Sequence, residues 1–86
     1  MKILYFAWLK SKTGIGEELV EPPPEVGDVA ALIEWLKSRS PGHAEAFADL
    51  AVVRAAVNQE YAPLDTPLGP DDEVALFPPV TGGRGR

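Results

Sequence analysis

Residues 69–79, with the sequence GPDDEVALFPP, contain the signals for one complete strand and for both of its ends. Residues 69–72 have the composition of a tight turn, since glycine and proline supply turn backbone angles and aspartate bonds to nearby amides. Residues 73–77 predict a strand. Pro78 and Pro79 end it, because proline has no amide hydrogen for a sheet ladder. We therefore expect the chain to leave a sheet after Phe77.

The first apolar run, residues 3–9, predicts a second strand. Alternation divides its side chains between two faces, with Ile3, Tyr5 and Ala7 on one and Leu4, Phe6 and Trp8 on the other. Because both sets are apolar, we expect a central strand that is covered on both sides. Residues 13–16 have a turn composition, and residues 17–21 predict the strand that returns beside the first as a hairpin.

A helix is predicted after the three prolines of residues 22–24, which form a stiff connector. Asp28 has the side chain of an N-cap, whose carboxylate accepts from the free amides of the first turn. The apolar residues that follow have the spacing of one helical stripe: Val29, Leu32, Ile33 and Leu36. We expect this helix to end near Arg39, before Pro41, and a second short helix over residues 43–50.

Three weaker segments complete the expected sheet. Residues 52–57 predict a strand, residues 58–60 a turn, and residues 61–64 a short edge piece that tolerates Pro63. The order is then two strands, a helix and later strands that return beside the first. This order predicts an α+β fold of the ubiquitin-like β-grasp type, in which one main helix packs on one face of a mixed sheet.

Composition indicates one small globular domain. The chain has 86 residues, 45% of them hydrophobic and 24% charged, and no cysteine, so neither a disulfide nor a cysteine nucleophile is available. We expect a β-grasp domain over residues 1–77 and an extended tail over residues 78–86. The apolar run at the start is too short for a signal peptide or a membrane span, which favours the cytoplasm and no membrane partner.

Charge is unevenly distributed along the chain. Six basic and thirteen acidic residues precede the last three positions, a balance of −7, and Arg84 and Arg86 bring the total to −5. An acidic body disfavours nucleic-acid binding, which needs a positive face against phosphates, and it favours a basic partner surface. No carboxylate stands at metal-ligand spacing from His43, so we expect a surface histidine and no metal site.

Three segments carry a resemblance to a known family: residues 4–7 (LYFA), 55–59 (AAVNQ) and 72–83 (DEVALFPPVTGG). Together they resemble the small, sulfur-carrier subunit of molybdopterin synthase over residues 1–83. The resemblance implies no tightly bound cofactor and no catalytic side chain. It implies instead that a partner enzyme uses ATP to adenylate the carboxylate of Gly83 and converts it to a thiocarboxylate. The large synthase subunit then receives the tail, and sulfur passes to cyclic pyranopterin monophosphate.

The tail has a physical role in this interpretation. Pro78 and Pro79 favour an extended geometry that projects from the body with little entropy to lose on insertion. Gly82 and Gly83 lack side chains and leave an active site room to close around the backbone. The whole inserted segment comprises Pro78, Pro79, Val80, Thr81 and Gly82, and it presents Gly83.

A docking surface is also implied by the resemblance. Phe6, Tyr61 and Phe77 match positions at which such carriers present an apolar patch, and Trp8 should extend it. Lys10 matches a basic position near that patch and could pair with a partner carboxylate. The alternatives are that the aromatic residues belong to the core and that Lys10 is a solvated lysine.

Residues 84–86 depart from the family pattern, because the Gly83 carbonyl is in an amide bond to Arg84. One interpretation is a precursor that a peptidase cuts after Gly83, and another is an extension foreign to the working protein. A third is a ubiquitin-like interaction module whose tail is never activated. A carrier for thiamine synthesis or tRNA thiolation also stays open, although the segment from Phe77 to Val80 favours molybdopterin synthase.

Overall fold

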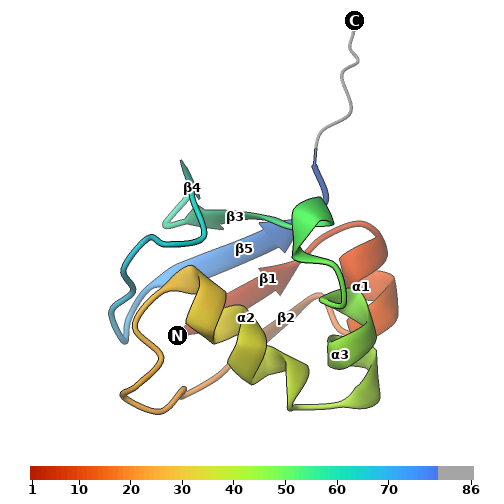
Figure 1. The fold of residues 1–86 in the computed structure, drawn as a ribbon, viewed down its shortest axis with the longest axis horizontal. Helices are drawn as coiled ribbons and strands as arrows, with labels where there is room; N and C mark the ends of the chain where they lie inside the picture. Colours follow the sequence, from red (N-terminus) through yellow and green to blue (C-terminus); the bar gives the residue numbers. More distant parts are fainter. Residues whose placement is uncertain (80–86) are drawn as a thin grey trace, which may run out of the picture.

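The computed structural model describes residues 1–79, which form a mixed five-stranded sheet and three α-helices. The strands stand in the order β2-β1-β5-β3-β4, with β1 parallel to β5 and the other neighbours antiparallel. The elements are β1 (Lys2–Tyr5), α1 (Trp8–Thr13), β2 (Glu17–Leu19), α2 (Val29–Lys37), α3 (Pro41–Ala46), the 3₁₀ turn η1 (Leu50–Val52), β3 (Arg54–Val57), β4 (Glu60–Ala62) and β5 (Glu73–Phe77). Figure 1 shows α2 in front of the sheet and α1 and α3 at one end of it. The predicted β-grasp architecture is confirmed.

One face of the sheet packs against α2 and forms the core. The residues that alternate onto this face are buried: Ile3, Tyr5, Ala55, Val74 and Leu76. They meet the predicted apolar stripe of α2, whose four side chains are fully buried. The predicted N-cap is confirmed, because the Asp28 carboxylate accepts from the Ala31 amide at 2.8 Å. Burial of one face therefore holds α2 and the sheet together.

The prediction of one strand over residues 3–9 is wrong in its second half. β1 ends at Tyr5, and the amide of Leu9 bonds to the carbonyl of Phe6 at 3.1 Å as α1 begins. Ala7 turns the chain with a φ of 55°. Residues 9–12 contain no β-branched side chain, so little opposes a helix there. The helical turn buries Leu9 in the core.

The expectation that β1 is covered on both sides is also wrong. Within the described residues, the helices pack on one face of the sheet, and the side chains of the opposite face, such as Leu4 and Ala75, are only half-buried. β1 is an interior strand, as predicted, because it lies between β2 and β5. Leu4, the one member of the second apolar set that lies on β1, belongs to a sheet face without a cover in residues 1–79, which we call the open face.

The second short helix begins earlier than predicted. α3 starts at Pro41, because proline suits the first helical position and Ser40 caps the turn by accepting from the His43 amide at 3.1 Å. It ends at Ala46, with the buried Phe47 at its C-cap. The turn η1 then replaces the predicted start of the next strand, and β3 begins at Arg54.

A tight turn joins β3 to the edge strand β4. Asn58 and Gln59 both have positive φ, 52° and 71°, as in a type I′ hairpin turn. The Asn58 side chain donates to Asp72 at 2.9 Å and accepts from the Glu73 amide at 3.0 Å. This side chain therefore fastens the turn to the start of β5.

Candidate functional site

The end of β5 defines the place where the chain leaves the sheet. β1 is parallel to β5, and the amide of Phe6 bonds to the Leu76 carbonyl at 3.1 Å. Phe6 and Phe77 therefore lie at the same end of the sheet. Pro78 and Pro79 follow β5 and are half-buried, and Figure 1 shows the last strand directed toward that end. The rest of the predicted tail, residues 80–86, lies outside the described part of the chain, including Val80, Thr81, Gly82 and Gly83.

Strand register builds the open face next to this exit. Leu4 pairs with Ala75, Ala75 with Ala56, and Ala56 with Tyr61, so these four side chains form one row across the sheet. The rings of Tyr61 and Phe77 lie 6.3 Å apart at 58°, on either side of β3. Two alanines therefore separate the larger apolar side chains and leave the row shallow.

The aromatic residues predicted for docking are exposed. Tyr61 is 68% exposed and Phe6 is 48% exposed, while Phe77 is half-buried. Phe6 lines a depression together with Leu4. Exposure of this size means that Phe6 and Tyr61 contribute little to the core, and it leaves aromatic side chains free to anchor an interface. Their contact with a partner stays a prediction.

Trp8 lies elsewhere than predicted. It occupies the first turn of α1 rather than a position on β1, and it is 37% exposed. Among residues 1–79 it stacks on no other aromatic ring. Lys10, two residues further along α1, is exposed and lines the same depression as Phe6. The structure therefore places Lys10 beside the open face, and the role of Trp8 stays untested.

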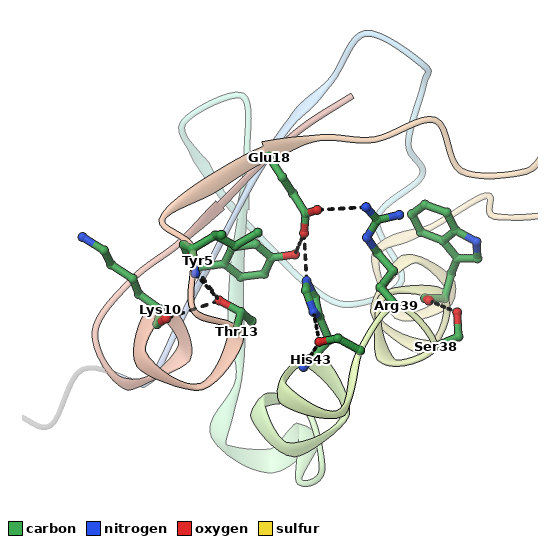
Figure 2. A network of polar contacts seen from close by, with 10 residues as sticks. Tyr5, Lys10, Thr13, Glu18, Ser38, Arg39 and His43 are labelled. Carbon is green, nitrogen blue, oxygen red and sulfur yellow. Dashed lines mark hydrogen bonds and ion pairs between the residues drawn. The ribbon is translucent and has the colours of Figure 1, made fainter.

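A polar network that sequence reasoning missed lies between β2 and the helices (Figure 2). The Glu18 carboxylate accepts from the Tyr5 hydroxyl at 2.6 Å and from His43 Nε2 at 2.9 Å, and its other oxygen is 3.1 Å from the Arg39 guanidinium. His43 Nδ1 is 2.7 Å from the Ser40 hydroxyl. A carboxylate only accepts, so His43 Nε2 donates to Glu18; in a neutral imidazole Nδ1 then carries no hydrogen and accepts from the Ser40 hydroxyl.

The expectation that His43 is a surface residue is wrong, since only 5% of it is exposed. α3 turns the imidazole toward Tyr5, and their ring centroids are 5.6 Å apart. The contacts to Glu18 and Ser40 replace the water that His43 would have on the surface. The signal in the sequence is the Ser-Pro pair that starts α3, but which side of the helix is buried depends on residues far along the chain.

The network shifts the pKa values of Tyr5 and Glu18. Burial, and next the hydrogen bond and charge of Glu18, raise the pKa of Tyr5 far above its usual value. Burial alone would raise the pKa of Glu18. The hydrogen bonds from Tyr5 and His43 and the charge of Arg39 outweigh that effect and lower the pKa. Because every member bonds to another member, the arrangement joins β2 to α3 and to the segment that follows α2, rather than offering a free catalytic group.

The described residues show neither a metal-binding cluster nor a membrane-spanning helix. Residues 1–79 contain no group of three or more histidine, cysteine, aspartate or glutamate side chains that could hold a metal ion. None of the helices in this part of the chain is both long and apolar enough to cross a membrane.

Comparison with known proteins gives consistent matches over the whole domain. The model of the ThiS family matches residues 3–83. The molybdopterin synthase sulfur carrier subunit of Escherichia coli is 39% identical over 83 residues, covering 96% of this chain and 99% of that protein. The human protein of the same name is 35% identical over 88 residues, covering 96% and 93%.

Solved structures agree with the sequence relatives. A putative molybdopterin converting factor subunit 1 from Pyrococcus furiosus matches with a TM-score of 0.74 and 36% identity, covering 92% of this chain and 95% of that one. Small archaeal modifier protein 1 from Haloferax volcanii matches with a TM-score of 0.75 and 28% identity, covering 96% and 98%. In a complex of subunits 1 and 2 of molybdopterin-converting factor from Helicobacter pylori, the matching chain has a TM-score of 0.62 and 25% identity, covering 95% and 96%. This chain therefore belongs to the ThiS family of β-grasp proteins, together with the molybdopterin synthase sulfur carrier subunits.

Proposed function

We propose that this chain carries sulfur for molybdopterin synthase as a thiocarboxylate on Gly83. The observation that carries the proposal is the placement of the tail motif. Residues 78–83 directly follow β5, at the sheet end where Phe6 and Phe77 lie, in a chain that is 39% identical to a sulfur carrier subunit. A domain of this shape can hold one reactive group beyond its edge and bring it to an enzyme.

Two steps load the sulfur. The Gly83 carboxylate attacks the α-phosphorus of ATP, releases pyrophosphate and becomes an acyl adenylate. Sulfur at the oxidation level of sulfide then attacks the acyl carbon, and AMP leaves with one of the former carboxylate oxygens, so that this oxygen is exchanged for sulfur. A partner enzyme supplies the ATP site and the sulfur donor. The chain itself supplies the substrate carboxylate and the surface that orients it, with no acid or base of its own.

The large subunit of molybdopterin synthase is the proposed acceptor. Support comes from the Helicobacter pylori neighbour, which is a complex of subunits 1 and 2 of molybdopterin-converting factor. In our proposal the exposed Phe6 and Tyr61 side chains and the half-buried Phe77 dock on the large subunit, and residues 78–83 enter its active site. Sulfur passes there to cyclic pyranopterin monophosphate, and water restores the Gly83 carboxylate. We expect this reaction in the cytoplasm.

Arg84 blocks this chemistry until it is removed, because the Gly83 carbonyl is in a peptide bond. We propose that a peptidase cuts after Gly83 and frees the carboxylate. An amide is a far weaker nucleophile toward phosphorus than a carboxylate, so the uncut chain is expected to remain unloaded.

Intact-mass measurement tests the proposal. The full-length chain and a version that ends at Gly83 are incubated with the cognate adenylating enzyme, ATP and a sulfur source. We expect the mass increase for exchange of one oxygen by sulfur only in the shortened version. An unchanged mass in both versions would rule out the carrier function.

A second candidate function is protein modification, favoured by the likeness to small archaeal modifier protein 1. A modifier forms an amide between its terminal glycine and a lysine of another protein, whereas a carrier returns to the free carboxylate. The same loading experiment, extended by adding a cell extract, separates them. Conjugates of higher mass would favour the modifier. Turnover of cyclic pyranopterin monophosphate would favour a sulfur carrier for molybdopterin synthase over one for thiamine synthesis or tRNA thiolation.

A further inference from the structure

Charge pairing distinguishes two of the basic residues in the described part of the chain. Residues 1–79 contain six Lys and Arg residues and thirteen Asp and Glu residues. Four of the basic side chains lie within 4.0 Å of a carboxylate: Lys2 with Glu17, Lys12 with Glu45, Lys37 with Glu34, and Arg39 with Glu18. Within those residues, Lys10 and Arg54 have no such partner. Two cations without a carboxylate are unexpected in a domain where acidic residues are twice as frequent.

Both of these cations lie beside the exposed aromatic side chains. Arg54 is the register partner of Phe77, so the two side chains share the open face. Lys10 lines the depression that Phe6 also lines. Phe6 and Phe77 lie at the sheet end where the chain continues into residue 78. The two cations therefore flank the aromatic residues nearest the tail.

The guanidinium of Arg54 is held in place by its own backbone surroundings. Its Nη1 donates to the carbonyls of Ala51 and Val53, each at 3.1 Å. No acceptor within residues 1–79 uses Nε or Nη2, which together form the second edge of the planar fork. That edge can bind a carboxylate through two parallel hydrogen bonds. Because the guanidinium is already fixed, less side-chain entropy is lost on binding.

We propose that Arg54 is a specificity-determining docking residue, which binds a carboxylate of the large synthase subunit next to Phe77. Lys10 contributes a second positive charge on the other side of the aromatic patch. This inference rests on the proposed function. It also refines the expectation from overall charge, because the acidic body favours a basic partner, whereas the surface around the tail favours an acidic one.

A protein carboxylate fits these observations better than a phosphate backbone does. The other four basic side chains are paired with carboxylates and acidic residues are in excess, so most of the surface would repel a nucleic acid. A short acidic rim around an apolar pocket meets the same two cations without that repulsion. Such an arrangement selects the partner by charge and anchors it by aromatic burial.

Binding of the shortened chain to the large subunit from the same organism tests the inference. Arg54→Glu should weaken binding by roughly 100-fold, and Arg54→Gln by roughly tenfold. The glutamine variant guards against misfolding, because it removes the charge without reversing it and keeps a polar side chain at this partly exposed position of β3. Lys37→Glu on α2 makes the same change of net charge on the helix-covered side, and it should alter the affinity less than about twofold.

Three outcomes decide the matter. Weakening by both Arg54 variants but not by Lys37→Glu supports the inference, especially if raising the salt concentration weakens the wild type more than Arg54→Gln. Equal effects of Arg54→Glu and Lys37→Glu would overturn it in favour of overall charge. Unchanged affinity of Arg54→Gln and Arg54→Glu, together with normal sulfur loading and wild-type binding, would overturn it and leave the carrier function intact.

Discussion

The two faces of the sheet use the same strands for different purposes. On the covered face, Ile3, Val74 and Leu76 are fully buried under α2. On the open face, their neighbours Leu4, Ala75 and Phe77 are only half-buried, and no helix of residues 1–79 packs on them. Strand alternation therefore assigns each residue to folding or to docking. A shift of one position along the chain changes which of the two properties a mutation should affect.

This division has an energetic reason. Apolar area on the covered face leaves water when the chain folds, so it stabilises the domain. Apolar area on the open face stays in water until a partner covers it, so it is available for association. The two faces should then respond to different measurements, with unfolding reporting on one face and affinity reporting on the other.

The largest expected effect is in the core under the covered face. Phe47, at the C-cap of α3, is fully buried against Tyr5 of that face, with ring centroids 6.1 Å apart. Phe47→Ala should lower the free energy of unfolding by about 4 kcal/mol, because it removes apolar contacts and leaves a cavity. Urea denaturation measures this loss. Tyr61→Ala, on the open face, should cost less than about 1 kcal/mol, and equal losses would contradict the division.

The next effect concerns the network that holds β2 to the helices. Glu18→Gln should lower stability at pH 7 by about 2–3 kcal/mol, because the buried Tyr5 and His43 donors lose a charged acceptor. Glu17→Gln is the matched control. Glu17 is next in the strand, is exposed, and reaches Lys2 only at 3.8 Å, so its loss should stay within about 0.5 kcal/mol.

The same variant has a predicted pH signature. The pKa of Glu18 is lowered in the folded state, so its contribution is fully present above the unfolded value of about 4.3 and disappears as pH falls through the folded pKa. Glu18→Gln should therefore flatten the stability profile below about pH 4. A profile with the wild-type slope would mean that another carboxylate is responsible. Asp72 is the control for that case, since a backbone amide and Asn58 also lower its pKa.

An intermediate effect is expected on the open face. Phe77→Ala should weaken binding to the large subunit by about 1–3 kcal/mol, while stability falls by less. Calorimetric titration measures the affinity. Leu19→Ala supplies the comparison. Leu19 lies on β2 and is a more exposed apolar residue, and it pairs with Lys2 at the end of the sheet away from Phe77. Equal weakening by both variants would mean that the patch near the tail has no special role.

Most of the fold could be predicted because its signals are local. The turn before β5, the cap at Asp28 and the stripe of α2 each lie within a few neighbouring residues. α1 could not be predicted in the same way. Residues 6–9 have the apolar composition of a strand, and the chain turns there because Tyr5 is the last residue of β1 to pair with β5.

The parts of the site that escaped prediction depend on distant residues. His43 is buried because α3 brings it to Glu18, which is 25 positions earlier in the chain. The place of Arg54 beside Phe77 depends on the register between β3 and β5. By contrast, Phe6 and Tyr61 were identified by family resemblance, and the structure finds both exposed. Local patterns can indicate which residues are apolar, but only the assembled sheet decides which face each residue occupies.

The smallest effect separates stability from binding most cleanly. Gln59 has a φ of 71°, and no side-chain hydrogen bond holds it within residues 1–79. Glycine adopts this conformation without strain but loses more entropy on folding, so Gln59→Gly should raise stability by about 0.5 kcal/mol. Asn58→Gly should lower stability, because it removes the bonds to Asp72 and Glu73.

If the faces act independently, thermal unfolding will register both changes, while affinity for the large subunit stays constant in Gln59→Gly. A gain in affinity that followed the gain in stability would mean that docking depends on how firmly the hairpin carrying Tyr61 is held, and that the open face is still partly unformed before the partner binds.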